Sequence, residues 1–376
     1  MKKLILATCV ASICSLTSAK AATVYDKDGT SMDIFGDIKV MAMSDSASRV
    51  IKSKTTKKTN DASLLNAVSL GLAGRAKITD GLYAIGFTQW LMPTGNNGID
   101  KIKSRHQYVG VDAQNLGTLT FGRGDNAYYA VAGATDIFNE LDSRVNDHYA
   151  FGDEEPSLFM YSLSTLGWDL RLSAQTAADR INDTDVDLKK GAAFSMATRT
   201  ESGISVAYGV SYYKFNYDDS DNRTVKYFQG VVNKMHGVES SNLTYANSQR
   251  PRFKVDKGIS VSYGTFGEGL YAAVNYTITK YNTFTNHLYS VEGVVNYTFD
   301  NGIGLSTGYG LKRFKGANVI ADLTIGAYYK PHPAFTVFAE ATFDTGSKWD
   351  RYYTKELKDN LALDRNKALI GAQYSY

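Results

Sequence analysis

Apolar and polar residues alternate with a period of two along most of this chain. In residues 32–40 the even positions are apolar or small, the odd positions carry Asp, Phe and Lys, and residues 168–175 repeat the alternation. Successive side chains of a β-strand point to opposite faces, so each segment would have one apolar and one more polar face. The alternation recurs in further segments: 204–212, 270–279, 289–299, 303–311, 319–329 and 335–343. The pattern predicts an all-β chain.

Two architectures share this pattern. A soluble sandwich or barrel buries its apolar face, whereas a transmembrane barrel turns that face to lipid and encloses a polar lumen. The segments run to about ten residues, which fits a tilted strand that crosses a bilayer, and aromatic residues such as Tyr289 and Phe299 flank the apolar faces. The other faces carry charges that would be costly in a dry core: Asp37, Lys39, Asp169, Arg171, Glu292, Lys312, Asp322 and Glu340. The sequence therefore favours the transmembrane barrel.

Turn signals indicate the number of strands. Seven short connections contain Gly or Pro: 79–81, 115–117, 165–167, 201–203, 265–268, 300–302 and 331–333. Eight longer polar stretches lie between them: 45–62, 93–103, 124–154, 177–188, 215–253, 281–287, 313–318 and 345–364. Their alternation predicts sixteen antiparallel strands with both termini on the short-turn side. Residues 223–235 could form one more strand, but bacterial single-chain barrels have even strand numbers, so we place them in the fifth long loop.

The first twenty-one residues have the features of a secretory signal peptide. Lys2 and Lys3 precede a short apolar core that ends at Ala19-Lys20-Ala21, a small-x-small cleavage site. The core is too short for a transmembrane anchor, and a lipoprotein would have to use Cys9 or Cys14, neither of which follows a convincing lipidation box. We therefore expect residues 1–21 to be removed and residues 22–376 to form the barrel, without cysteine.

Composition and motifs argue against nucleic-acid binding and catalysis. The chain has 41 basic and 38 acidic residues. Three of the basic residues belong to the signal, so the mature chain has no formal net charge and no basic surface for a nucleic acid. Residues 304–308 match the G-x-S-x-G pattern of serine hydrolases, but they lie in an alternating segment and not at a strand-to-helix elbow. The five His have no metal-ligand spacing. We expect no enzyme activity, cofactor or metal site.

Three stretches resemble the general, trimeric porins of Gram-negative outer membranes. They are residues 24–37 (VYDKDGTSMDIFGD), residues 105–142, which run from RHQYVGVD to IFNELD, and residues 368–376 (ALIGAQYSY). The resemblance extends over nearly all of the mature chain. It implies a sixteen-stranded homotrimer in the cell outer membrane, with long extracellular loops and short periplasmic turns. It also implies that the third loop, about residues 124–154, folds into the lumen and narrows it.

The resemblance also implies which residues form the constriction. Members of the family oppose acidic residues on the third loop to basic residues on the wall. By position the loop acids are Asp136 and Glu140, with Asp142 as an additional acid, and Arg105 matches one wall arginine. The parity that Arg105 shares with Gln107 is expected to face the lumen.

Other wall positions depart from the family. The usual lysine of the first strand is replaced by Asp37, a second family arginine by Ser69, and a third falls near Glu154. Further basic residues are expected on the lumen wall: Lys39, Arg75, Lys77 and Arg171. Because net charge at the constriction sets ion preference, the resemblance together with these changes predicts a weakly cation-selective pore.

Two further features concern assembly. Arg123 has the parity of Leu119 and Phe121 and should point outward. It would either extend to the lipid headgroups or, as the resemblance implies, contact the second loop of a neighbouring subunit, with Asp100 as its partner. Tyr374 and Tyr376 resemble the C-terminal signal read by the outer-membrane insertion machinery.

The favoured function is passive diffusion of ions and small hydrophilic solutes through an outer membrane that contains lipid and lipopolysaccharide. The alternative is a substrate-selective channel, for example for sugars, which would need an aromatic track along the lumen. Tyr213, Tyr271 and Phe338 have lumen parity but form no visible row. An outer-membrane enzyme or adhesin is a third alternative, for which the sequence offers no catalytic or binding cluster.

Overall fold

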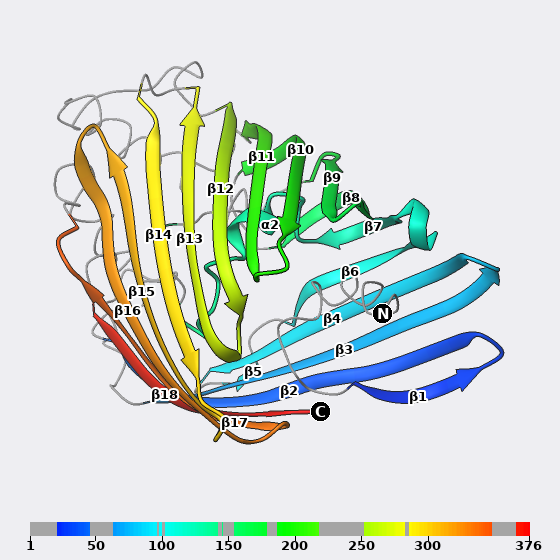
Figure 1. Cartoon of the computed structure of the whole chain (residues 1–376), viewed down its shortest axis with the longest axis horizontal. Helices are drawn as coiled ribbons and strands as arrows, with labels where there is room; N and C mark the ends of the chain where they lie inside the picture. Colours follow the sequence, from blue (N-terminus) through cyan, green and yellow to red (C-terminus); the bar gives the residue numbers. More distant parts are fainter. Residues whose placement is uncertain are drawn as a thin grey trace.

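The computed structural model forms an antiparallel barrel, and it describes residues 21–45, 63–95, 98–99, 102–141, 145, 154–178, 186–217, 252–282, 286–347 and 366–376. Each barrel strand pairs with the next one along the chain, and β18 pairs with β2 to close the ring (Figure 1). The sixteen strands of the described chain that form this ring are β2 (Thr30–Asp45), β3 (Ser63–Thr79), β4 (Leu82–Gly95), β6 (Lys103–Asp112), β7 (Thr118–Gly124), β8 (Glu155–Thr165), β9 (Trp168–Gln175), β10 (Val186–Arg199), β11 (Ile204–Tyr217), β12 (Phe253–Thr265), β13 (Glu268–Tyr281), β14 (Leu288–Thr298), β15 (Ile303–Phe314), β16 (Ala317–His332), β17 (Phe335–Asp344) and β18 (Lys367–Ser375). The predicted sixteen-stranded barrel is confirmed.

Two further short strands lie outside the ring. The strand β1 (Ala22–Lys27) forms a hairpin with the start of β2, and β5 (Gly98–Ile99) pairs with the end of β4. Asp28 and Gly29 join β1 to β2 with φ angles of 54° and 76°. An Asp-Gly pair with two positive φ angles is a favoured hairpin turn.

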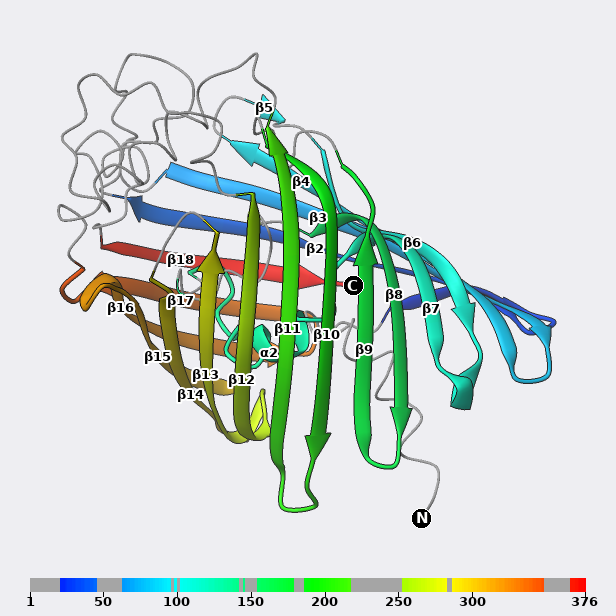
Figure 2. The same ribbon diagram turned by 90° about the horizontal axis from the view of Figure 1, so that it is seen from above.

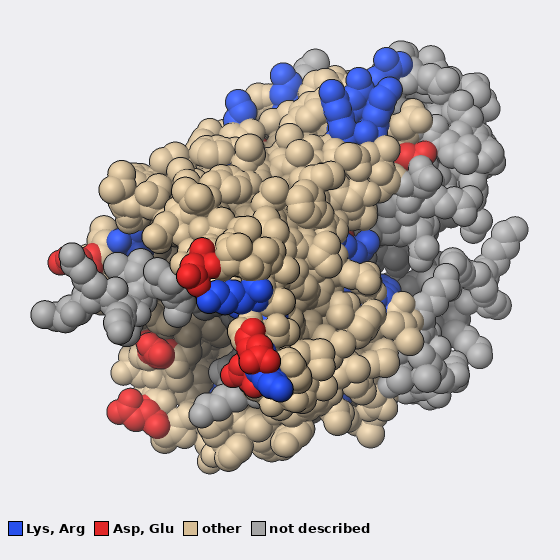
Figure 3. Space-filling view, turned by 90° about the vertical axis from the view of Figure 1, so that its right-hand side faces the viewer, with Lys and Arg blue, Asp and Glu red and all other residues tan. Residues whose placement is uncertain are grey.

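The outer surface of the barrel is apolar and the inner surface is polar. On β9, Leu172 is 57% exposed while its neighbour Ser173 is 2% exposed, and on β13 Val274 is 54% exposed beside Asn275 at 0%. Most of the outer face in Figure 3 is uncharged. The apolar faces therefore point outward, as predicted for a barrel in lipid and opposite to a soluble barrel. No helix among the described residues is long and apolar enough to span a membrane.

The short turns lie at all seven predicted places. Residues 80–81 join β3 to β4 and residues 299–302 join β14 to β15, with Gly81 and Gly302 both at φ 82°, a conformation that Gly adopts without strain. At the other end of the barrel most connections are longer, and large parts of them, including residues 223–235, lie outside the described residues. The prediction of a long loop at 313–318 is wrong: Lys315 and Gly316 alone join β15 to β16, with φ angles of 47° and 79°, and two positive φ angles make a tight hairpin turn.

The segment after β7 turns into the barrel. It contains the short helix α2 (Tyr129–Ala132), which lies within the ring of strands (Figure 2). Tyr128, Val131 and Ala132 of this segment pack against two small residues of the wall, Ala193 and Ala207. A Cβ at Gly258 would overlap the hydroxyl of Tyr128. The inner wall is therefore shaped to receive this loop.

Candidate pore constriction

The tip of the third loop is held by one buried carboxylate. Glu340 on β17 accepts hydrogen bonds from the backbone N–H groups of Asn139, Glu140 and Leu141 at 2.6, 3.0 and 2.9 Å. The hydroxyl of Tyr328 donates a further bond to Glu340 at 2.8 Å. A carboxylate that accepts several backbone donors holds a chain segment firmly, because charge-assisted hydrogen bonds are stronger than neutral ones.

The rest of the described loop is bonded along the wall from β11 to β14. Thr135 donates to Glu292 at 2.6 Å, and Tyr271 donates to the carbonyl of Ala134 at 2.6 Å. Asn126 donates to the hydroxyl of Tyr213, at the start of the loop. The aromatic residues predicted on the lumen side, Tyr213, Tyr271 and Phe338, therefore support the loop; Phe338 packs against Leu141.

Several acidic residues of the inner wall are covered by this loop or by neighbouring strands. Glu292 and Glu340 are almost fully buried and bond the loop as described above. Asp256 lies beside Lys254 at 3.3 Å and also accepts from Thr279 at 2.6 Å. These carboxylates have little contact with water, so they contribute less to the local field in the pore than exposed carboxylates do.

Lys39 and Glu140 form an ion pair across the constriction. Lys39 was predicted to be a wall residue, and the structure places it at the loop tip. It lies on β2 one inward-facing position beyond Asp37. Lys39 thus brings a positive charge to the inner wall two positions beyond Asp37, where the porin resemblance predicts a lysine.

The two main departures from the family pattern contact each other. Asp37 and Ser69 are direct cross-strand neighbours on β2 and β3, and the hydroxyl of Ser69 donates to the carboxylate of Asp37. On the loop, Asp136 is exposed and accepts from the hydroxyl of Tyr129 at 2.9 Å. Neither Asp37 nor Asp136 has an ion-pair partner among the described residues. Asp142, the third predicted loop acid, lies outside them.

The prediction that Gln107, at the parity of Arg105, faces the lumen is wrong. Val109 is 64% exposed on the outer face, so Gln107, of the same parity, also faces outward. The register of β4 with β6 shifts between the pairs Thr88–Gln107 and Trp90–Ser104, and this irregularity interrupts the alternation at Arg105. Arg105 donates to the buried carboxylate of Glu154 at 2.7 Å, at the end of the third loop.

The other predicted wall cations each have an acidic partner. Arg75 lies 3.0 Å from Asp112, and its guanidinium stacks on the ring of Tyr83 at 3.8 Å. The remaining two pairs are Lys77 with Asp80 at 2.6 Å and Arg171 with Asp169 at 3.8 Å. Lys77 and Asp80 belong to the β3–β4 turn and not to the constriction.

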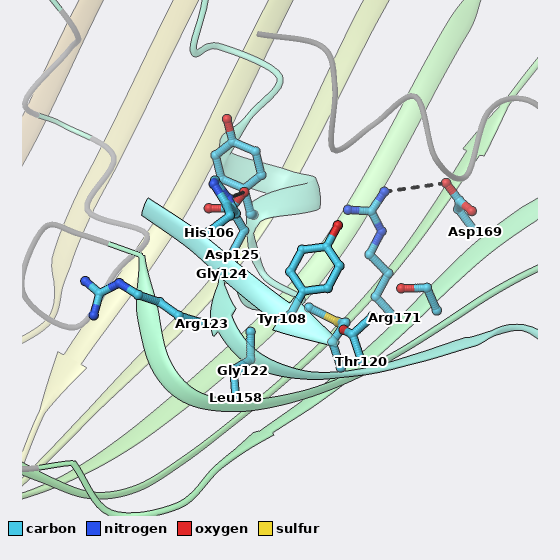
Figure 4. Close-up of a pocket in the computed structure, with 13 residues that line it drawn as sticks. His106, Tyr108, Thr120, Gly122, Arg123, Gly124, Asp125, Leu158, Asp169 and Arg171 are labelled. Carbon is cyan, nitrogen blue, oxygen red and sulfur yellow. Dashed lines mark hydrogen bonds and ion pairs between the residues drawn. The ribbon is translucent and has the colours of Figure 1, made fainter. Parts of the chain in front are cut away.

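A recess in the inner wall lies beside the third loop (Figure 4). His106 and Asp125 approach to 3.2 Å at one side of it, and Arg171 and Asp169 lie at the other. Tyr108 lies between these pairs, and its ring stacks on that of Phe87 with a centroid separation of 5.2 Å. The sequence did not predict this aromatic pair, because the two residues lie on different strands and alternation describes only the faces of a single strand.

Arg123 points away from this recess (Figure 4). It is the cross-strand neighbour of Gln107, which is in turn the neighbour of Thr88. The Nε atom of Arg123 and the hydroxyl of Thr88 are buried and make no hydrogen bond within the described chain. A polar row thus crosses an otherwise apolar outer face. Asp100, the predicted partner of Arg123, lies outside the described residues.

The C-terminus completes the ring. Gly36 and Tyr376 exchange two backbone hydrogen bonds of 3.0 Å, and the hydroxyl of Tyr376 lies over Gly36, where a Cβ would approach it to 2.7 Å. Tyr374 is 51% exposed on the outer face. Both predicted signal residues therefore lie on β18 or at its end, next to β2.

Comparison with known proteins extends these observations. A family model described as Gram-negative porin matches residues 7–376. The outer membrane porin PhoE of Escherichia coli (strain K12) is 26% identical over 363 residues, which are 90% of this chain and 92% of the relative. The outer membrane protein U of Vibrio vulnificus is 29% identical over 163 residues, 43% of this chain and 44% of the relative.

Solved structures of low sequence identity have the same fold. The Salmonella typhi OmpF complex with daunomycin has a TM-score of 0.68 at 16% identity and covers 94% of this chain and 100% of its own. The OmpT protein of Vibrio cholerae has a TM-score of 0.61 at 14% identity, covering 94% and 99%.

Proposed function

This chain belongs to the Gram-negative porin family, and from that premise we propose that it is a weakly cation-selective diffusion channel for ions and small hydrophilic solutes. Family membership places the barrel in the bacterial outer membrane as a diffusion channel. The proposal concerns the ion preference, which depends on the few charges that face water at the constriction.

One observation carries the ion preference. The charges at the constriction are compensated in Lys39–Glu140 and Arg105–Glu154, whereas Asp37 and Asp136 accept hydrogen bonds from neutral hydroxyls only. Two carboxylates without a cationic neighbour attract cations and repel anions. Because the lumen is wet, each charge acts through a high dielectric, and the preference is small.

The experiment is a planar-bilayer recording across a KCl gradient. We expect stepwise channel openings and a reversal potential that indicates modest cation preference. Asp37→Asn should reduce this preference, while Asp80→Asn, at a turn where the side chain of Asp80 is 97% exposed, should leave it unchanged. A clear anion preference of the native channel would refute the selectivity, and the absence of any conductance would refute the channel itself.

We also propose contacts with other outer-membrane components. Four lysines lie on the outward faces of adjacent strands, close to the long-loop end of the barrel: Lys190, Lys214, Lys257 and Lys280. Lys190 and Lys214 are cross-strand neighbours, and none of the four has an ion pair in the described part of the chain. A row of free cations at the edge of an apolar belt suits the phosphates of lipopolysaccharide.

No catalytic role is proposed for the G-x-S-x-G match. Residues 304–308 lie inside the alternating strand β15, and the hydroxyl of Ser306 accepts a hydrogen bond from Asn296 at 2.9 Å. The removal of residues 1–21 stays a prediction, since residues 1–20 are outside the described chain.

A further inference from the structure

Three aromatic side chains form a row on the inner wall beside the recess of Figure 4. Phe35 on β2 and Phe87 on β4 have ring centroids 5.2 Å apart at an interplanar angle of 30°. Phe87 and Tyr108 on β6 are stacked at 5.2 Å and 8°, and His106 meets the ring of Phe87 edge-on at 6.2 Å. Phe35, Phe87 and Tyr108 all retain intermediate exposure, so the row presents ring surface to the lumen.

A glycine makes the row continuous. Phe35 and Phe87 are separated by the strand β3, where Gly71 is the cross-strand neighbour of Phe35. The ring of Phe35 lies over Gly71, since a Cβ at that position would overlap it. On the next step, Phe87 and Tyr108 are direct cross-strand neighbours. Cross-strand aromatic pairs of this kind support one another, and here they form one apolar strip across four strands.

The strip is bordered by hydrogen-bonding groups. Tyr108 and His106 also line the recess of Figure 4. Tyr129 of the third loop lines the same recess, as do the hydroxyls of Thr120 and Ser162. Other polar side chains of the recess lie in two pairs, His106–Asp125 and Arg171–Asp169, which supply hydrogen-bond donors and acceptors.

Resting on the proposed channel function, we propose that the row and the recess form a subsite for neutral saccharides in transit through the pore. A pyranose has an apolar C–H face and a rim of hydroxyls. The aromatic strip matches the face, and the bordering hydroxyls and paired polar side chains match the rim. Ligand sites generally combine an apolar and aromatic lining with a few placed polar groups. The subsite borders the third loop through Asp125 and Tyr129.

The experiment measures saccharide block of the ion current in planar bilayers. Maltotriose should reduce the current of the native channel saturably. Phe87→Leu and Tyr108→Leu keep apolar bulk but remove the ring, and each should raise the half-saturating concentration by up to about tenfold. Maltotriose should block Phe87→Tyr, which keeps the ring, as it blocks the native channel. Phe194→Leu is the matched control, because Phe194 is 39% exposed on the outer face.

The outcomes separate this inference from the channel function. Normal conductance without saturable block, or block that the two leucine variants leave unchanged, overturns the saccharide subsite and leaves the channel intact. Ring faces also attract organic cations, so block by tetraethylammonium that exceeds saccharide block and is lost in Phe87→Leu would likewise overturn the saccharide assignment. Lack of conductance in the native protein refutes the channel. Heat-dependent mobility in gels checks that each variant folds.

Discussion

The contribution of each charged residue at the constriction to ion preference depends on the group that it contacts. The carboxylate of Asp37 is bonded by a hydroxyl and that of Glu140 by an ammonium group, although both are predicted constriction residues. A substitution at the constriction should therefore change ion preference with a sign that depends on which member of a pair it removes.

Replacement of Lys39 by methionine should increase cation preference. The change removes the positive partner of Glu140 and keeps most of the apolar side chain, so a third uncompensated carboxylate faces the lumen. Two unit charges 4 Å apart in bulk water interact with about 1 kcal/mol. This interaction energy limits the change in the cation-to-anion permeability ratio to roughly fivefold. Reversal potentials in a KCl gradient measure it.

The matched control is Lys77→Met. Lys77 is paired with Asp80 at the β3–β4 turn, away from the constriction, so its loss should not change the reversal potential. Equal shifts in both variants, or a shift of Lys39→Met toward anions, would contradict the assignment of Lys39 to the constriction.

The described part of the third loop forms no backbone ladder with any strand. Its described part is held by side chains of the wall, and its tip depends on Glu340, which is almost fully buried. The helix α2 has only four residues, too few to be stable by itself. Tertiary contacts must therefore determine the position of the loop.

Replacement of Glu340 by alanine should loosen the loop tip. Three backbone N–H groups and the hydroxyl of Tyr328 lose their acceptor, and each buried donor without a partner costs about 1–3 kcal/mol. The sixteen-stranded ladder does not involve this side chain, so the barrel should still assemble. Single-channel recordings should show larger current fluctuations and altered conductance.

The control for this variant is Glu268→Ala. Glu268 begins β13 at a short turn and is exposed, so its removal should leave the current unchanged. A quiet Glu340→Ala channel with native conductance would mean that the other loop contacts suffice.

On the outer face of the whole molecule, two buried polar atoms have no hydrogen-bond partner within the described chain. The buried Nε of Arg123 and hydroxyl of Thr88 flank Gln107. We propose that a neighbouring subunit of a homotrimer supplies the missing acceptors, with Asp100 among them. Burial of an unpaired guanidinium in lipid would be costly.

Replacement of Arg123 by alanine should weaken the trimer. The temperature at which trimers dissociate in detergent should fall, as read from semi-native gels, while the monomeric barrel persists. Arg199→Ala, at an exposed position near the β10–β11 turn, should not change it. Native-like trimer stability of Arg123→Ala would rule out an important subunit contact.

Deletion of Tyr376 should impair insertion into the outer membrane. It removes the aromatic end of the proposed assembly signal and the two hydrogen bonds to Gly36 that close the ring. Fractionation of cells should find the shortened chain in the periplasm. Tyr376→Phe keeps the ring and the backbone bonds, so it should insert normally, and normal insertion of the deletion variant would refute the signal.

Loss of the lysine row should reduce the lipopolysaccharide that copurifies with the trimer. Replacing Lys190, Lys214, Lys257 and Lys280 with alanine removes four cations from the long-loop edge of the apolar belt. The matched control replaces all four with arginine, which keeps the charge. Equal amounts of bound lipopolysaccharide in the two variants, measured by phosphate analysis, would contradict the proposal.

The sequence by itself determined the architecture. Alternation identified the faces of segments such as 168–175 and 270–279, and turn residues such as Gly81 and Gly302 marked where strands end. Both signals are local, because the direction of a side chain in a strand and the φ of a turn residue depend on neighbours in the chain. The strand number and the outward apolar face followed from them, whereas the inward third loop was expected only from the resemblance to porins.

Only the tertiary structure decided which residues meet at the pore. The pair Lys39–Glu140, the contact Asp37–Ser69 and the row through Phe87 join positions far apart in the sequence. Such contacts depend on the register between strands. One register shift, near Arg105, separates the orientation of Arg105 from that of Gln107, which the sequence predicted to be the same. Turn geometry and the buried face constrain the register of neighbouring strands, but a bulge such as the one near Arg105 and the contacts of the third loop depend on packing between distant segments.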